Sequence, residues 1–222
     1  AAALLVTALV QQRAGTSAAL ALPGPKGEAA GGAAPIVALP AAVEWTLVAV
    51  ILYGGLYLRL HRIDLIPPGL NNDEAINALE VRDIGAGRPF SSLTERGLNR
   101  ETMFHYLAAF TYRSPGLGLN LLRAMPAFFG LDPRLINDPL MDLVFPLRSA
   151  AIVAGTLTIL ALYLFARRRF GIPVALLASL FLAVSPWHLL YSRVGLRAIL
   201  APLFAVAAAG LFLRALETDR LR

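Results

Sequence analysis

Four apolar segments, separated by polar stretches, dominate the pattern of this chain. A helix rises about 1.5 Å per residue, so about 20 apolar residues cross the hydrocarbon core of a bilayer. The segments that approach this length lie at about residues 41–60, 147–166, 172–190 and 197–213. The pattern therefore predicts an all-α membrane protein with four transmembrane helices.

The links between these segments differ greatly in length. Only the five residues from Arg167 to Gly171 join the second span to the third, which predicts an antiparallel helix hairpin. In contrast, residues 61–146 form one long loop after the first span. We expect short amphipathic helices inside this loop, one beginning after Asn71 and another covering about 100–112.

The end of the loop combines apolar residues with residues that interrupt a membrane span. Residues 117–129 are apolar but include an arginine and a proline, which favours a helix that lies at the membrane surface. Pro133, Pro139 and Pro146 predict an irregular path for the residues before the second span.

Residues 1–40 are rich in alanine, glycine and proline, and we interpret them as a flexible leader ahead of a membrane domain at 41–222. The chain begins at Ala1 rather than at a methionine and ends directly after an apolar segment. We therefore expect it to be the N-terminal portion of a longer protein.

Composition supports a membrane protein and narrows its chemistry. Apolar residues make up 57% of the chain and charged residues 15%, against roughly 25% charged residues in soluble domains. There is no cysteine, which excludes disulfides and thiolate metal sites. The net charge of +6 comes from arginines at the edges of apolar segments, so we expect lipid headgroups and not nucleic acid as partners.

The positions of the arginines also predict an orientation. The positive-inside rule places the cluster Arg167–Arg169 on the cytoplasmic side, and the 61–146 loop then lies outside the cytoplasm. Five further arginines fall at the opposite, outer face and need another explanation, for which phosphate binding is one candidate. They are Arg59, Arg62, Arg148, Arg193 and Arg197.

The segment Asn71-Asn72-Asp73-Glu74 is the first candidate for chemistry. Asn71 and Glu74 have the spacing of a helix capping box, so these residues have a purely structural interpretation. However, the segment follows the first span closely, behind a Pro-Pro-Gly turn, which holds it near the membrane surface. A carboxylate there can act as a general base or hold a divalent cation.

Several further segments, in this order and spacing, resemble the GT-C fold glycosyltransferases, specifically the bacterial relatives of the dolichyl-phosphate-mannose protein mannosyltransferases. The segments that carry the resemblance are Pro68–Ala75, Glu101–Leu107, Phe145–Arg148, Arg168–Gly171, Ser185–His188 and Tyr191–Arg193. The resemblance covers about residues 45–214. It implies a glycosyltransferase in the bacterial plasma membrane that serves protein glycosylation, and the later spans that complete its donor site are missing from this chain.

The resemblance also implies roles for individual residues. Asp73 matches the family's catalytic base, and the donor is a sugar carried on a polyprenyl phosphate. The acceptor is a sugar, a lipid or a protein. The departing lipid phosphate needs positive charge, for which Arg148, Arg193 and Arg197 are candidates.

Three more residues complete the candidate substrate site. Glu74 adjoins the proposed base, and Glu101 and His105 are four residues apart, so they would share one face of a helix. Two ligands are too few to define a metal site, and a divalent cation stays an open cofactor. We interpret His188 as an interfacial histidine, and each arginine also has an alternative interpretation as a headgroup anchor.

Two other functions compete with the glycosyltransferase. A transporter would place polar or charged residues in mid-span and would pair broken helices, whereas the second and fourth spans are almost entirely apolar. A structural membrane subunit without catalytic activity would leave the loop acids as helix caps only.

Overall fold

The computed structural model describes residues 39–94, 96, 100–113 and 116–217. The expected leader at 1–40 falls almost entirely outside these residues. Every named element in the described part is a helix, which confirms the all-α prediction. The elements are α2 (Ala41–Leu60), α3 (Asn72–Gly85), α4 (Met103–Arg113), α5 (Gly116–Ala124), α6 (Pro126–Phe129), α7 (Pro133–Ile136), α8 (Pro139–Phe170), α9 (Ile172–Val184), α10 (Pro186–Arg193), the 3-10 helix η1 (Arg197–Ile199) and α11 (Leu200–Glu217).

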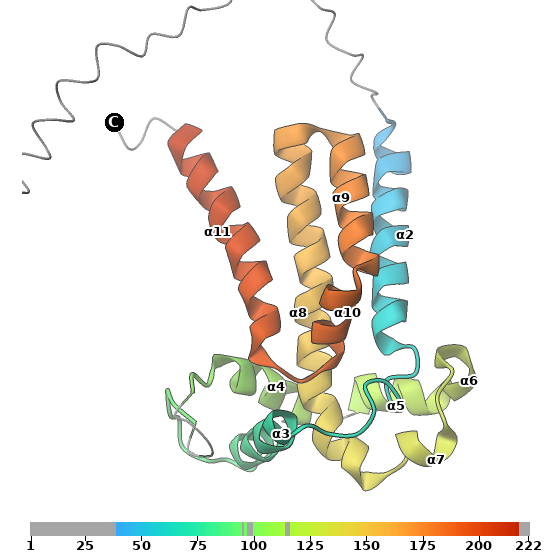
Figure 1. The fold of residues 1–222 in the computed structure, drawn as a ribbon, viewed down its shortest axis with the longest axis vertical. Helices are drawn as coiled ribbons and strands as arrows, with labels where there is room; N and C mark the ends of the chain where they lie inside the picture. The colour runs from blue at the N-terminus through green and yellow to red at the C-terminus, as the bar shows by residue number, and fades with distance from the viewer. Residues whose placement is uncertain (1–38, 95, 97–99, 114–115, 218–222) are drawn as a thin grey trace, which may run out of the picture. The chain divides into compact units, whose positions relative to one another are not determined.

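Three described helical segments are long and apolar enough to cross a membrane, and a fourth span is present if one bent pair is counted. The three are α2, α8 and the segment Arg197–Leu216, which joins η1 to α11. The bent pair is α9 with α10, which meet at an angle of 56°. The long helices lie alongside one another, while α3 to α7 gather at one end of them (Figure 1).

Helix α8 begins eight residues before the expected second span. The Asp138 side chain accepts a hydrogen bond from Leu140 N at 2.8 Å, and Pro139 occupies the first turn, where its missing N–H costs nothing. Pro146 lies inside the helix. The expectation of an irregular path through Pro139 and Pro146 is therefore wrong, because a cap and packing against α3, α4 and α5 stabilise a helix there.

The helices of the loop are anchored on α8 by a shared apolar core. Ala78 and Val81 of α3, Phe104 of α4, and Leu147 and Ala151 of α8 are all buried in it. Burial of each such large side chain contributes on the order of 1.5–3 kcal/mol. This core packs α3, whose first turn carries Asp73, against the N-terminal half of α8.

A buried arginine marks the bend between α9 and α10. Arg59 of α2 is fully buried, and its Nη1 donates to Gly55 O at 2.6 Å and to Ala183 O at 3.4 Å. Its Nη2 donates to Nδ1 of His188, 2.7 Å away. His188 is itself 8% exposed, so the histidine that the sequence places at the membrane interface is buried against protein. The bend places this histidine against α2, and the pair joins α2 to the broken span.

Gly155 offers a test of the packing at this bend. A Cβ at Gly155 of α8 would lie 2.9 Å from Ser192 Cβ and closer still to Ser192 Oγ. We expect Gly155→Ala to destabilise the protein by about 1–3 kcal/mol through overpacking, measured as a lowered unfolding temperature in detergent micelles. Gly54→Ala is the control, because nothing lies within 4 Å of that position. Equal unfolding temperatures for the two variants would contradict this account.

Candidate functional site

Asp73 lies in the first turn of α3, at the solvent-exposed edge of the helical cluster. The Asn71 side chain caps this helix by accepting a hydrogen bond from Glu74 N at 2.7 Å, as its sequence spacing indicates. The Asp73 side chain is 54% exposed, and its Oδ1 lies 3.3 Å from Nη2 of Arg100. The cap is therefore made by Asn71, which leaves the Asp73 carboxylate accessible apart from one ion pair.

The neighbouring acid, Glu74, has the opposite environment. Glu74 and Arg148 are 1% and 3% exposed and form a two-pronged ion pair, with Nε to Oε1 at 2.8 Å and Nη2 to Oε2 at 3.1 Å. Glu74 Oε1 also accepts from Gly195 N at 3.1 Å. In a complete capping box, the Glu74 side chain would also accept a hydrogen bond from the backbone N–H of Asn71. The Glu74 carboxylate instead turns inward to Arg148 and Gly195.

Arg148 extends this junction to the segment after α2. Its Nη1 donates to Ile63 O at 2.9 Å and its Nη2 donates to Gly69 O at 3.1 Å. One guanidinium thus connects α8, α3 and the turn that precedes α3. Both residues were expected in the substrate site, and the structure pairs them with each other in the protein interior.

A second buried contact continues along the same face of α3. Asn77 Nδ2 donates to Gly195 O at 3.3 Å, and its Oδ1 accepts from Nε2 of His105 at 3.1 Å. His105 is fully buried, and this burial lowers the pKa of the imidazole below its usual range. His105 therefore acts here as a neutral donor that orients Asn77. The sequence signal for Asn77 was its position three residues after Glu74, on the same helix face.

Glu101 faces a different partner from the one that its spacing suggested. Helix α4 begins at Met103, so Glu101 precedes the helix and does not share a helical face with His105. Its side chain is 65% exposed and forms an ion pair with Arg197, which is 36% exposed. A hydrogen bond from its own backbone N–H lowers the pKa of Glu101, and the charge of Arg197 lowers it further.

These two ion pairs form one cluster, because Arg100 and Glu101 are consecutive residues. Arg100 contacts Asp73, and Glu101 contacts Arg197. We call these four residues the charged cluster. It joins the start of α3 to the start of η1 and holds two carboxylates and two guanidiniums at the surface. Sequence reasoning missed Arg100, and its only signal was its position directly before Glu101.

Arg193 was also expected in the substrate site, and its guanidinium binds backbone instead. It donates from Nε to Ile66 O at 3.1 Å, from Nη1 to Leu58 O at 3.0 Å and from Nη2 to His61 O at 2.6 Å. These carbonyls belong to the end of α2 and the turn after it. Arg193 therefore holds α10 against the end of α2.

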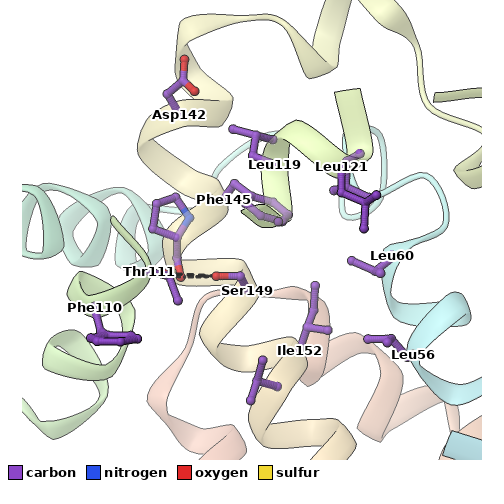
Figure 2. A pocket seen from close by; sticks show the side chains of 14 residues that line it. Leu56, Leu60, Phe110, Thr111, Leu119, Leu121, Asp142, Phe145, Ser149 and Ile152 are labelled. Atoms are coloured by element: carbon purple, nitrogen blue, oxygen red, sulfur yellow. Dashed lines mark hydrogen bonds between the residues drawn. The ribbon is translucent and has the colours of Figure 1, made fainter. Parts of the chain in front are cut away.

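A large apolar cavity lies on the other side of α8 from this end of α3. It has a volume of about 730 Å³ and lies between α2, α4, α5 and α8 (Figure 2). Its few polar groups include Thr111 and Ser149, whose hydroxyls are 3.2 Å apart, and Asp142. The apolar wall includes Leu56, Leu60, Phe110, Leu119, Leu121, Leu122, Phe145, Ile152 and Val153.

No group of three or more histidine, aspartate or glutamate side chains in the described ranges could hold a metal ion. Within those residues, the two exposed carboxylates of the charged cluster each face an arginine. The cluster thus presents two carboxylates and two guanidiniums at one place on the surface.

Comparison with known proteins adds the family. Residues 135–222 match the family model described as dolichyl-phosphate-mannose-protein mannosyltransferase. Over these residues the chain is similar to this family. The matched region begins in α7 and extends through α8 to the end of the chain, so it contains Arg148, Arg193 and Arg197, whereas Asp73 and Glu101 precede it. No significant match was found to a curated protein or to a solved structure.

The family match agrees with the resemblance of the sequence and with the membrane-spanning helices. The matched family points to membrane glycosyltransferase activity of the mannosyltransferase type. The helices indicate an integral membrane protein.

Proposed function

We propose that this protein transfers a sugar from a polyprenyl-phosphate donor to an acceptor at the extracytoplasmic membrane surface, with Asp73 as general base. The observation that carries the proposal is the charged cluster, which presents Asp73 beside Arg100 and Glu101 beside Arg197. This arrangement belongs to a relative of the mannosyltransferase family, whose members act on lipid-linked sugars.

The reaction follows from the positions of these charges. The acceptor hydroxyl or amine attacks the anomeric carbon of the donor, and its proton passes to an Asp73 carboxylate oxygen. The bond between the anomeric carbon and the phosphate oxygen breaks with inversion. The polyprenyl phosphate leaves with one more negative charge, which a nearby guanidinium stabilises.

The candidate arginines differ in the contacts that each would lose on binding a substrate phosphate. Arg148 is buried against Glu74, and Arg193 donates to three backbone carbonyls. Both would lose internal contacts if they turned to a substrate. Arg197 and Arg100 each face an exposed carboxylate, and exposed ion pairs contribute only about 0–1 kcal/mol. We therefore assign the leaving phosphate to Arg197, with Arg100 as a second cation.

The apolar cavity supplies a place for the lipid part of the donor. Its walls come from α2 and α8, which are candidate membrane spans, and from α4 and α5 in the loop. An isoprenoid chain that enters from the bilayer would meet almost only apolar side chains there. Two of the helices that line this cavity, α4 and α8, also pack against α3, which lies on the other side of α8.

Substitution of Arg197 tests the phosphate assignment. We expect Arg197→Gln to lower sugar transfer roughly 10²-fold, because one positive charge at the leaving group is lost. Membranes from cells that express the complete gene provide the acceptor, and release of radiolabel from polyprenyl-phosphate mannose reports transfer. Arg96→Gln is the matched control, since Arg96 is an exposed arginine that pairs with Asp83. Unchanged transfer in Arg197→Gln would remove this arginine from the proposed site.

A further inference from the structure

Six large apolar side chains are exposed on the loop helices α4, α5 and α6. Their exposed fractions lie between 43% and 75%, and they occur in two sets of three. The first set belongs to α4, and the second runs from α5 into α6. We call these six residues the apolar collar: Met103, Leu107 and Phe110 in the first set, and Leu121, Met125 and Phe128 in the second.

The spacing within each set places its side chains on one side of the local structure. Residues three and four positions apart are neighbours on a helix surface, and both sets advance by four and then by three positions. The opposite face of α4 is buried through Phe104 and Ala108, and that of α5 through Leu119 and Leu122. Each helix therefore has one apolar face in the protein core and a second apolar face that is exposed.

Contacts join the collar to the membrane-spanning surface. Phe128 packs against Tyr57 near the end of α2, with ring centroids 5.5 Å apart. Phe110 and Leu121 line the apolar cavity together with Val153 of α8, which belongs to a candidate span and is itself exposed. The collar is therefore continuous with the apolar surface that α2 and α8 present to lipid.

The figures show where the collar lies along the spans. In Figure 1, α4 and α5 lie at the level where α2 ends and α11 begins, whereas α3 and α7 lie further from the spans. Figure 2 shows Phe110 on the side of Ser149 that faces Ile152 and Leu56, with Asp142 on the opposite side. The collar thus lies at the level where the surface of a bilayer meets the loop helices.

We propose that the apolar collar inserts into the leaflet of the bilayer nearest to the loop, with lipid acyl chains as its partner. The apolar face of an interfacial helix lies about 5–10 Å into the boundary between headgroups and acyl chains. The sequence favours a surface position only for residues 117–129, and the collar extends this position to α4. The proposal does not depend on the glycosyltransferase reaction.

Two features favour lipid over a protein partner. The collar carries no charge, and the arginine of α5 turns away from it: Arg123 donates from Nε to Ile136 O at 3.1 Å and from Nη2 to Asp142 Oδ1 at 3.0 Å. The two sets also lie on two sides of the apolar cavity, as Phe110 and Leu121 show in Figure 2. One bilayer surface contacts both sets at once, whereas a single partner helix would cover one of them.

The experiment measures whether lipid or water surrounds the collar. The chain contains no cysteine, so one introduced cysteine can carry a fluorophore at a chosen position. The full chain is reconstituted in phosphatidylcholine vesicles, and labels are quenched either by a nitroxide on the acyl chain near the headgroup or by aqueous iodide. We expect the nitroxide to quench labels on Phe110→Cys and Leu121→Cys about threefold more strongly than a label on Leu140→Cys, because collar residues lie below the headgroups.

Leu140→Cys is the matched control. Leu140 is a leucine with 48% exposure, close to the 53% of Leu121, but it lies at the beginning of α8, on the side of the loop helices away from the spans (Figure 1). Its label should be quenched by iodide, which also tests whether the fluorophore enters lipid by itself. Val153→Cys, on a candidate span, gives the nitroxide quenching of a position in lipid.

Each contrary result overturns the proposal. Iodide quenching at positions 110 and 121 equal to that at position 140 would show that the collar faces water. Protection from both quenchers would show that protein covers it, either a second copy or another part of the chain. Nitroxide quenching at only one of the two positions would show that α4 and α5 do not form one membrane-inserted surface.

Discussion

Replacement of Asp73 by asparagine is expected to reduce sugar transfer by about 10²–10⁴-fold, the usual contribution of a general base. Asparagine keeps the size of the side chain but cannot take the acceptor proton. Asp73 is exposed and its one ion pair, with Arg100, is at the surface, so the variant should fold normally. The measurement is release of label from polyprenyl-phosphate mannose in membranes that contain the protein expressed from its complete gene.

Two control variants distinguish catalysis from helix capping. Asp83→Asn alters another acid of α3, which pairs with Arg96 and Arg82, and should leave transfer within about twofold of the wild type because Asp83 lies outside the charged cluster. Asn71→Ala removes the side-chain cap and should cost about 1 kcal/mol of stability without abolishing transfer. If Asp73→Asn behaves like Asn71→Ala, with lower stability and nearly normal transfer, Asp73 is only part of the helix start.

Replacement of Glu74 by glutamine is expected to have the largest effect on stability, about 3–5 kcal/mol. The substitution leaves the Arg148 guanidinium buried without an opposite charge, and removal of one partner from a buried ion pair has this cost. We expect a lower unfolding temperature in mixed micelles, while Gly195 N can still donate to the amide oxygen at position 74.

Glu101→Gln is the matched control for this prediction. Glu101 is also a glutamate paired with an arginine, but its side chain is 65% exposed, so its loss should change stability by only about 0–1 kcal/mol. The double variant Glu74→Leu/Arg148→Met removes both buried charges and should recover part of the loss. It should not recover all of it, because Ile63 O and Gly69 O lose their donor. Equal costs for Glu74→Gln and Glu101→Gln would refute the buried-pair interpretation.

Local patterns predicted much of the fold. The first span was expected at residues 41–60, and α2 covers Ala41–Leu60, because a run of apolar residues bounded by polar ones defines a membrane helix without reference to the rest of the chain. The cap by Asn71 could likewise be predicted from the sequence, because its hydrogen bond joins residues only three positions apart. In contrast, Pro146 suggested an irregular segment, and packing of α8 against its neighbours overrode this local preference.

The candidate site was predicted less completely, because its residues are far apart in sequence. The sequence indicated Asp73 through the family resemblance and marked the outer arginines as needing an explanation. It could not assign their partners. Arg148 reaches Glu74 across 74 positions, and Arg197 reaches Glu101 across 96. Arg100 and Asn77 gave no strong signal, because their partners Asp73, His105 and Gly195 are distant in sequence.

The sequence by itself thus determined the membrane class, the approximate spans and the acid at the start of α3, since these depend on apolar length and local spacing. Only the tertiary structure decided which charges are buried. Glu74 and Asp73 are adjacent and chemically alike, yet one is 1% exposed and fixed by Arg148, whereas the side chain of the other is 54% exposed. Successive residues of a helix point about 100° apart, and only the packing of α3 on α8 determined which of the two faces inward.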